Sequence, residues 1–142
     1  MDTSHRKSNL HRARHLRIYR AAQLAFAKRQ APASTLAPQL LQRLEAIIEA
    51  HLDDGHFDVT ALCREIGLSR SQLHRRLKAL TGHSTTEFIR RYRLRAARKL
   101  LHGGQHNVSD ACYAVGFNCP GYFSKCFVRH YGSPPVNFIP VD

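Results

Sequence analysis

The chain has 142 residues and a formal net charge of +12, and apolar residues make up 43% of it. This length suits one ordinary domain with a tail, and the apolar fraction allows a packed core, which excludes disorder throughout. The positive charge indicates a polyanionic partner, although a basic surface also attracts membranes and RNA. No run approaches the roughly 18 consecutive apolar residues that span a bilayer, and the N-terminus lacks the apolar core of a secretory signal.

The four cysteines include no C-x-x-C pair, which is typical of a reduced, cytoplasmic protein. Cys112, Cys119 and Cys126 recur every seven residues, a spacing that invites a metal site. Because Cys112 and Cys126 fall at apolar helix positions, we instead expect them to pack as small hydrophobes, with no metal or cofactor bound. Neither paired carboxylates nor a Ser/His/Asp arrangement stands out, so the sequence does not predict an enzyme.

The charge is distributed unevenly along the chain. Residues 1–31 carry eight Lys or Arg and one acid, whereas residues 45–65 carry six acids and one Arg. Residues 70–99 then carry ten Lys or Arg and a single acid, Glu87. A basic segment next to an acidic one is typical of a docking face with a solvated opposite face.

The first part of the chain, residues 1–39, is a basic segment with a loosely patterned helix followed by the linker QAPASTLAP. A helix with Pro38 in its first turn is then expected to run as far as Gly55. Its apolar spacing predicts the buried positions Leu40, Leu41, Leu44, Ile47, Ile48 and Leu52.

Two shorter helices follow. Asp58 is placed to cap the first, and Gly67 ends it. Ser69-Arg70-Ser71-Gln72 is a capping box that starts the second helix, over about residues 69–81. The spacing predicts that its buried side comprises Leu73, Leu77 and Leu80.

A second capping box, Ser84-x-x-Glu87, starts a long helix over residues 84–101. The apolar spacing predicts one inward face along the whole helix, formed by Phe88, Ile89, Tyr92, Ala96 and Leu100. The charge run of Arg90, Arg91, Arg95 and Arg98 is expected to be a solvated face.

The pattern of the two short helices then repeats. The residues Asp58, Val59, Cys63, Ile66 and Gly67 match Asn107, Val108, Cys112, Val115 and Gly116 at a constant offset of 49. Leu73 and Leu77 match Phe123 and Phe127 at an offset of 50. The sequence therefore predicts a duplicated helix-turn-helix, whose last helix covers about residues 119–130.

No strand-like alternation of useful length occurs, so the sequence predicts an all-α fold of about seven helices. We expect a first helix-turn-helix unit at residues 40–82, a linker helix at 84–101 and a second unit at 107–138. A linker helix of this length spans roughly 25 Å. With the widths of the flanking helices, the two recognition helices would lie about 34 Å apart, one turn of DNA, and could read successive major-groove segments.

The second helix of each unit carries the predicted base-reading side chains. Once Leu73 and Leu77 turn inward, the outer face of the first comprises Arg70, Ser71, His74, Arg75 and Lys78. Arg75 can donate two hydrogen bonds to a guanine. The corresponding face of the second helix offers Gly121, Tyr122, Ser124 and Lys125, a poorer reading surface with one charge.

Two segments, IGLSRSQLHRRLKALTGHSTTEFIRRYRLRAARKLL and VSDACYAVGFNCPGYFSKCFVRHYGSPPVNF, resemble the AraC/XylS family of bacterial transcription regulators. The resemblance covers about residues 40–138 and implies base contacts at Arg70, Ser71, His74, Arg75, Pro120, Gly121, Ser124 and Lys125. We further expect DNA-backbone contacts at Ser69, Lys78, Asn118, Tyr122 and Arg129. Arg93 matches the linker arginine of the family, which implies a chiefly structural role.

Three positions depart from the family pattern. Ala111-Cys112 stands where Ile-Ala is usual, Val128 where Lys is common, and Ile139 where Arg is usual. These changes leave the expected fold intact, but they predict weaker contacts with the DNA backbone near the second unit.

We interpret the chain as a sequence-specific, double-stranded DNA-binding transcription regulator. Two alternatives stay open: a nonspecific nucleic-acid-binding protein, and a module that binds a protein such as RNA polymerase.

Members of the family normally carry a sensing or dimerising domain, and residues 1–39 are too short to form one. Their sequence resembles the junction in two-component hybrids, so we favour an output domain that partners a receiver or sensor domain over a stand-alone regulator. This interpretation predicts weak hydrogen-exchange protection of residues 1–30, and a deletion of residues 1–35 that leaves the melting temperature nearly intact.

Overall fold

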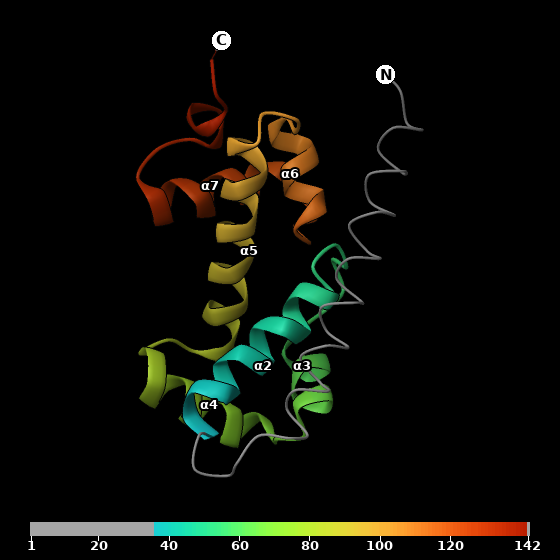
Figure 1. The fold of residues 1–142 in the computed structure, drawn as a ribbon, viewed down its shortest axis with the longest axis vertical. Helices are drawn as coiled ribbons and strands as arrows, with labels where there is room; N and C mark the ends of the chain where they lie inside the picture. The colour runs from blue at the N-terminus through green and yellow to red at the C-terminus, as the bar shows by residue number, and fades with distance from the viewer. Residues whose placement is uncertain (1–35, 142) are drawn as a thin grey trace. The chain divides into compact units, whose positions relative to one another are not determined.

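The computed structural model describes residues 36–141 of the chain. The expectations for residues 1–35, including the basic helix and its weak protection, lie outside the described residues. Within residues 36–141 the fold is all-helical, as predicted (Figure 1). The elements are α2 (Leu36–Ala50), α3 (Val59–Ile66), α4 (Arg70–Thr81), α5 (Thr85–His102), α6 (Val108–Ala114), α7 (Pro120–Tyr131) and the 3-10 helix η2 (Pro135–Phe138). None of these helices is long and apolar enough to cross a membrane.

The described residues form two compact units, to both of which helix α5 contributes. Of the described residues, unit 1 contains residues 36–51 and 57–89. Unit 2 contains residues 52–56 and 90–141. The first residues of α5 therefore belong to unit 1 and the remainder of the helix to unit 2.

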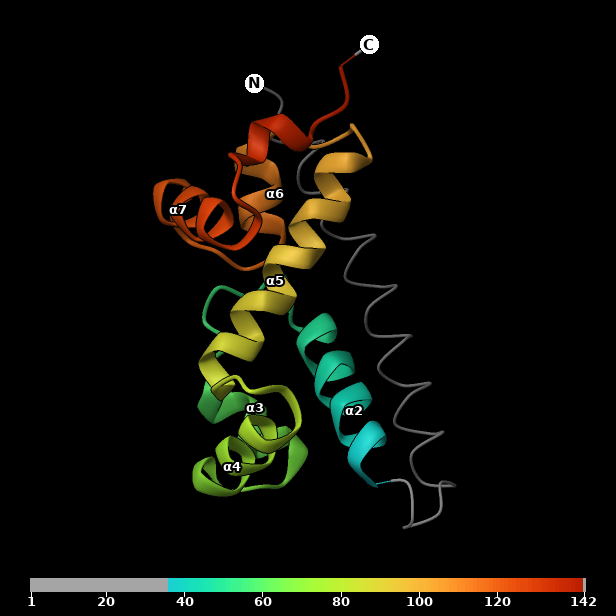
Figure 2. The same cartoon turned by 90° about the vertical axis from the view of Figure 1, so that its left-hand side faces the viewer.

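Unit 1 is built from α2, α3 and α4, with α3 packed against both of the others (Figure 2). Helix α2 has Pro38 in its first turn, as predicted, but it ends at Ala50 rather than near Gly55. Beyond it, Phe57 is buried and its ring stacks on that of His51, with centroids 4.6 Å apart. The core is completed by Leu40, Leu44, Ile48, Leu62, Ile66, Leu73 and Leu77.

Leu80 does not belong to this core, so its predicted burial is wrong: its side chain is 42% exposed. Leu80 lies in the last turn of α4, a helix of 12 residues that packs on the 8 residues of α3. Lys78, Ala79 and Leu80 are all exposed, so this side of the last turn faces solvent. The polar Thr81 is half-buried there instead, and its Oγ1 donates to the carbonyl of Leu77 at 2.8 Å.

Unit 2 packs α6 against α7, and α7 against η2. Its centre is aromatic, because Phe123 and Phe127 of α7 are fully buried with ring centroids 5.7 Å apart. Cys112 and Cys126 are buried among these apolar positions, as the sequence predicted.

Helix α5 does not bury the single stripe that its sequence predicted. Phe88 and Ile89 are buried as expected, whereas the predicted inward residues that are only half-buried are Tyr92, Ala96 and Leu100. The side chains buried farther along the helix are Leu94, Ala97 and Leu101. The stripe is interrupted because the first residues of α5 pack in unit 1 and the later ones in unit 2.

Candidate nucleic-acid interface

Helices α3 and α4 form a helix-turn-helix whose turn is fixed by caps on both sides. The Asp58 carboxylate caps α3 by accepting a first-turn N–H at 2.9 Å. Gly67 ends α3 with a φ of +78°, and its N–H donates to the Cys63 carbonyl at 2.9 Å. Ser69 and Gln72 then make both hydrogen bonds of the predicted capping box. These bonds fix the turn and hold α4 in place against α3.

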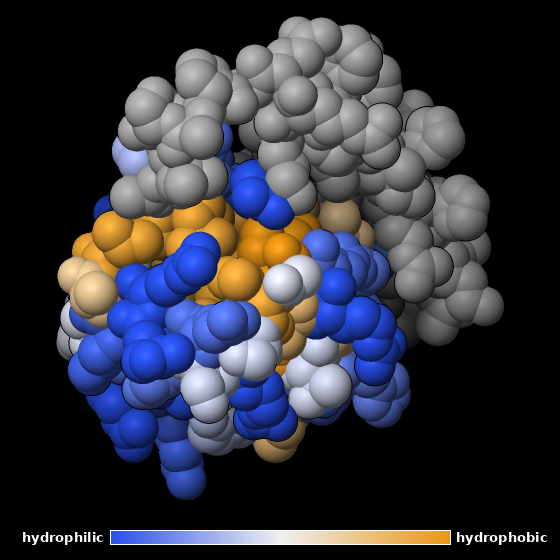
Figure 3. All heavy atoms as spheres, turned by 90° about the horizontal axis from the view of Figure 1, so that it is seen from below, coloured by the Kyte–Doolittle hydropathy of each residue, from blue (hydrophilic) through white to orange (hydrophobic). Residues whose placement is uncertain are grey.

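The outer face of α4 is basic and open to solvent, because Leu73 and Leu77 turn inward. All the residues that the sequence predicted here are exposed, namely Ser69, Arg70, Ser71, His74, Arg75 and Lys78. Arg70 is partly held, since its Nη1 donates to Thr60 Oγ1 of α3 at 3.2 Å. Figure 3 looks onto unit 1 from the side on which α4 lies, where hydrophilic side chains gather beside an apolar area.

A groove of about 370 Å³ lies on this face within unit 1. Its lining comprises Val59, Arg70, Ser71, His74, Arg75, Ser84, Thr85 and Thr86. Four of these are predicted base-reading residues of α4, and three are Ser84 and the first two residues of α5. Helical periodicity could group the four, but it could not reveal that the start of the next helix completes the same groove.

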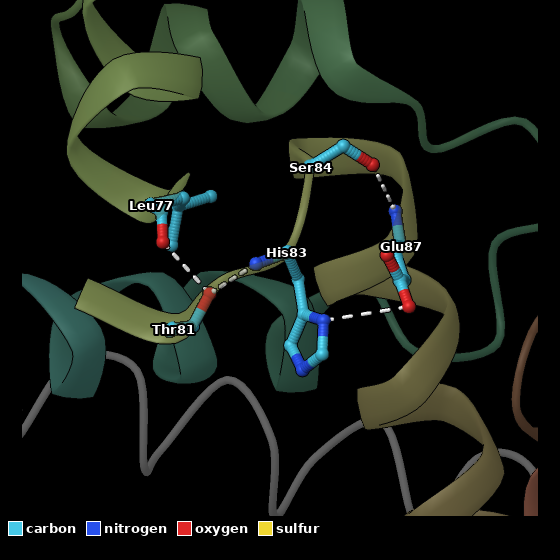
Figure 4. A network of polar contacts seen from close by, with 5 residues as sticks. All are labelled: Leu77, Thr81, His83, Ser84 and Glu87. Atoms are coloured by element: carbon cyan, nitrogen blue, oxygen red, sulfur yellow. Dashed lines mark hydrogen bonds and ion pairs between the residues drawn. The ribbon is translucent and has the colours of Figure 1, made fainter. Parts of the chain in front are cut away.

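A network of polar contacts fixes the start of α5 beside α4 (Figure 4). Thr81 Oγ1 donates to the Leu77 carbonyl at 2.8 Å and accepts the N–H of His83 at 3.1 Å. Ser84 Oγ accepts the N–H of Glu87 at 3.2 Å, the first half of the predicted capping box. The Glu87 carboxylate in turn lies 3.4 Å from Nδ1 of His83. The first turn of α5 is thereby held at the edge of the groove.

The second helix-turn-helix presents α7 after a turn at Gly116, whose φ is +91°. Asn107 caps α6, as predicted, by accepting the N–H of Asp110 at 2.8 Å. Of the residues predicted to contact DNA from this unit, those that are exposed are Asn118, Gly121, Tyr122, Lys125 and Arg129. Pro120 and Ser124 are half-buried. The second face is therefore less open than the first at two of its predicted base-reading positions.

Asn118 makes a structural contact that the sequence did not predict. Its Nδ2 donates to the carbonyl of Gly55 at 3.1 Å, across 63 residues of sequence and within unit 2. A Cβ on Gly55 would collide with the Asn118 side chain. The sequence marked Gly55 only as a helix end, and no local pattern points from it to a partner so far along the chain.

Arg93 lies half-buried in unit 2, where its Nη2 donates to the carbonyl of Asp54 at 3.4 Å. Burial lowers the pKa of Arg93, and the negative charge of Asp54 acts in the opposite direction. The guanidinium joins residues 52–56 to helix α5 inside this unit. This contact agrees with the structural role that the family resemblance implied.

Cys119 is exposed immediately before α7, whereas Cys63, Cys112 and Cys126 are buried. The pKa of its thiol is lowered, chiefly by the backbone N–H of Tyr122 and then by that of Gly121. Desolvation opposes this shift and the charge of Lys125 adds to it. Among residues 36–141, no cluster of three or more His, Cys, Asp or Glu side chains could hold a metal ion.

Known proteins resemble the chain over the same region. Residues 62–139 match the helix-turn-helix domain family. A curated relative, histidine kinase P4 of Formosa agariphila, is 38% identical over 105 residues, which make up 74% of this chain and 8% of the kinase. The chain spans between 8% and 29% of the length of the curated relatives that it matches first.

Two solved structures share the fold. The C-terminal domain of the two-component response regulator yesN from Fusobacterium nucleatum is 25% identical, with a TM-score of 0.62 over 73% of this chain and 98% of that domain. The DNA-binding domain of AdpA, determined in complex with a target DNA, is 28% identical, with a TM-score of 0.62 over 69% of this chain and 87% of that one.

Proposed function

Because the chain belongs to the AraC type of the helix-turn-helix domain family, we propose that it binds double-stranded DNA sequence-specifically and regulates transcription. The observation that carries this proposal is the outer face of α4, where Arg70, His74 and Arg75 are exposed together along one groove. The AdpA domain, which was solved on its target DNA, supports the same use of the fold.

Helix α4 is the proposed base-reading helix of unit 1. The major groove is about 12 Å wide and admits one α-helix with its side chains. Arg75 is exposed and can form two hydrogen bonds to one guanine, while Ser71 and His74 lie on the same face. The caps on both sides of the turn favour specificity, because a helix that is already fixed loses little conformational freedom on binding.

Helix α7 is the proposed second recognition helix, and it contributes more to affinity than to base discrimination. The family resemblance assigns Gly121, Ser124 and Lys125 to base contacts, but Lys125 alone among them is charged. Exposed Lys125 and Arg129 also suit phosphate oxygens. Ser69, Lys78, Asn118 and Tyr122 complete the proposed backbone contacts. On this proposal the two units read successive major-groove segments from one chain.

The proposal also concerns the signalling system in which this domain works. The relatives include a protein named as a histidine kinase and the C-terminal domain of a two-component response regulator. The kinase shares only 8% of its length with this chain, so we attribute no catalysis to the shared segment. We propose that residues 40–138 serve as the output domain for a receiver or sensor domain in the cytoplasm, with RNA polymerase as a further partner.

Selection of binding sites from a random duplex library tests the DNA proposal directly. We expect an enriched motif with two conserved blocks about one helical turn apart. Competition with unselected duplex and with double-stranded RNA separates the alternatives. Equal affinity for selected and random duplexes would overturn the specific regulator in favour of a nonspecific binder, and no binding to either would favour a protein-interaction module.

A further inference from the structure

Thr85, the first residue of α5, has a buried hydroxyl without a hydrogen-bond partner. Its side chain is 4% exposed, and Oγ1 makes no hydrogen bond with any other residue in the range 36–141. Leaving a buried polar group unsatisfied costs free energy, and a valine of the same shape would avoid that cost. Thr85 also lines the groove. Its unsatisfied hydroxyl therefore points to a ligand that accepts this hydrogen bond.

The backbone beside Thr85 offers two further donors. Of the first-turn N–H groups of α5, that of Glu87 is bonded to Ser84 Oγ and that of Phe88 to the Ser84 carbonyl. The N–H groups of Thr85 and Thr86 make no hydrogen bond within the described residues, as is usual for the first positions of a helix. Helix α5 has 18 residues, so its N-terminus carries the partial positive charge that attracts anions.

The groove itself is cationic. Arg70, His74 and Arg75 line it together with Thr85 and Thr86, and no acidic side chain belongs to its lining. Guanidinium groups, hydroxyls and helix N–H groups are the donors that bind phosphate oxygens. The chemistry of the lining therefore fits a phosphoryl group rather than an apolar ligand or a cation.

We propose that this groove binds one phosphate of the DNA backbone, with the Thr85 hydroxyl and the N–H groups of Thr85 and Thr86 as donors. The inference rests on the proposed function, because it takes α4 to be the helix that meets DNA. The hydrogen-bond network at Thr81, His83 and Ser84 fixes this helix end relative to α4. A phosphate held there would set the depth and register at which α4 enters the major groove.

Thr85→Val, which removes the hydroxyl and keeps the shape, tests the proposal in the purified chain. We expect the melting temperature to stay the same or rise, because the variant removes an unsatisfied polar atom. We expect DNA affinity to fall by about tenfold, the effect of losing one hydrogen bond to a charged group. Ser109→Ala is the control, because Ser109 is an exposed hydroxyl near the start of α6 and outside the groove. Equal losses of affinity in the two variants would overturn the proposal.

Duplexes with a single neutral methylphosphonate identify the phosphate concerned. For the wild-type chain we expect one position at which neutralisation costs about tenfold, and for Thr85→Val no further loss at that position. Unchanged sensitivity of the variant would overturn the proposal. The comparison of affinities between Thr85→Val and Ser109→Ala works on any duplex that the chain binds, so a lack of sequence preference would defeat the proposed function without obscuring that comparison.

A titration with inorganic phosphate distinguishes a DNA phosphate from a free phosphate as the ligand of the groove. In amide NMR spectra of the free chain, we expect at most weak shifts of Thr85 and Thr86 on addition of inorganic phosphate. Saturating shifts of these amides, combined with a featureless methylphosphonate scan, would show that the groove takes a free phosphate and would overturn the assignment to DNA.

Discussion

Gly116 lies directly against the guanidinium of Arg93 within unit 2. A Cβ on Gly116 would stand 3.0 Å from Arg93 Nε and 2.6 Å from the carbonyl oxygen of Leu52. The φ of Gly116 is +91°, a region that side chains with a Cβ rarely adopt. Because Arg93 also donates to the carbonyl of Asp54, the turn before α7, residues 52–56 and helix α5 all meet at this point.

Replacing Gly116 by Ala should therefore destabilise the chain more than the backbone conformation alone would. We expect a loss of about 2–4 kcal/mol, since strain at positive φ adds to overpacking against a backbone oxygen. Gly132→Ala is the matched control, because Gly132 has a φ of +78° and a Cβ added to it would meet no heavy atom of the described residues within 4 Å. It should lose only about 1–2 kcal/mol. Equal losses in chemical denaturation of the two variants would show that the contact with Arg93 and Leu52 contributes nothing.

The starts of α3, α4 and α6 could be predicted from the sequence because they depend on local interactions, whereas α2 was expected to run to Gly55 and ends at Ala50. Ser69 and Gln72 are three residues apart, and they form the capping box that their identities require. Asp58 and Asn107 each cap their helix by accepting one backbone N–H three residues later. The inward face of α5 could not be predicted, because Phe88 and Leu94 pack in different units. Periodicity assumes one core for each helix, and this helix serves two.

The candidate site shows the same division between local and tertiary information. The outer face of α4 follows from the inward turn of Leu73 and Leu77, so its predicted members Arg70, Ser71, His74, Arg75 and Lys78 could be grouped in advance. The contribution of Thr85 to the same groove depends on how the chain turns after Thr81. The contact between Asn118 and Gly55 spans 63 residues and carries no local signal.

Arg75→Ala tests whether α4 reads bases. We expect a loss of about 1–3 kcal/mol in DNA-binding free energy and a relaxed preference at one base position. Arg76→Ala is the matched control, because Arg76 is exposed on the same helix but does not line the groove. Titrations of both variants on the selected site and on its single-base variants measure the effect. If Arg75→Ala keeps the affinity and motif of the wild type, α4 presents a different face to DNA.

Lys125→Ala should weaken binding by similar factors on all sequences, because α7 carries few base-reading side chains. Affinity for DNA should fall steeply with salt, and removal of one phosphate contact should reduce the slope of log K against log salt by about 1. Lys99→Ala, at an exposed lysine of α5, controls for the loss of charge alone. If Lys125→Ala instead changed the binding motif, Lys125 would be assigned to base recognition. If the two variants had equal salt slopes, Lys125 would not contact a phosphate.

Cys119 should react selectively with alkylating reagents in the folded chain. It is exposed, whereas the other three cysteines are buried. Because the N–H groups of Tyr122 and Gly121 lower the pKa of its thiol, a larger fraction is thiolate at any pH below the ordinary thiol range. The alkylation rate should therefore rise with pH and level off at a lower pH than for free cysteine. Mass spectrometry after limited iodoacetamide treatment identifies the modified residue, and Cys119→Ser should abolish the reaction.

The same reaction reports on the proposed role of α7, because Cys119 precedes the first residue of that helix. If α7 enters the major groove, DNA bound there should cover Cys119 and slow its alkylation. Added phosphate backbone also places negative charge near the thiol, which disfavours the thiolate and slows the reaction further. The selected duplex should protect Cys119, and an unselected duplex at the same concentration should protect it much less. Equal rates with and without the selected duplex, at saturating DNA, would mean that DNA leaves the start of α7 uncovered, and the second recognition helix would have to be assigned elsewhere.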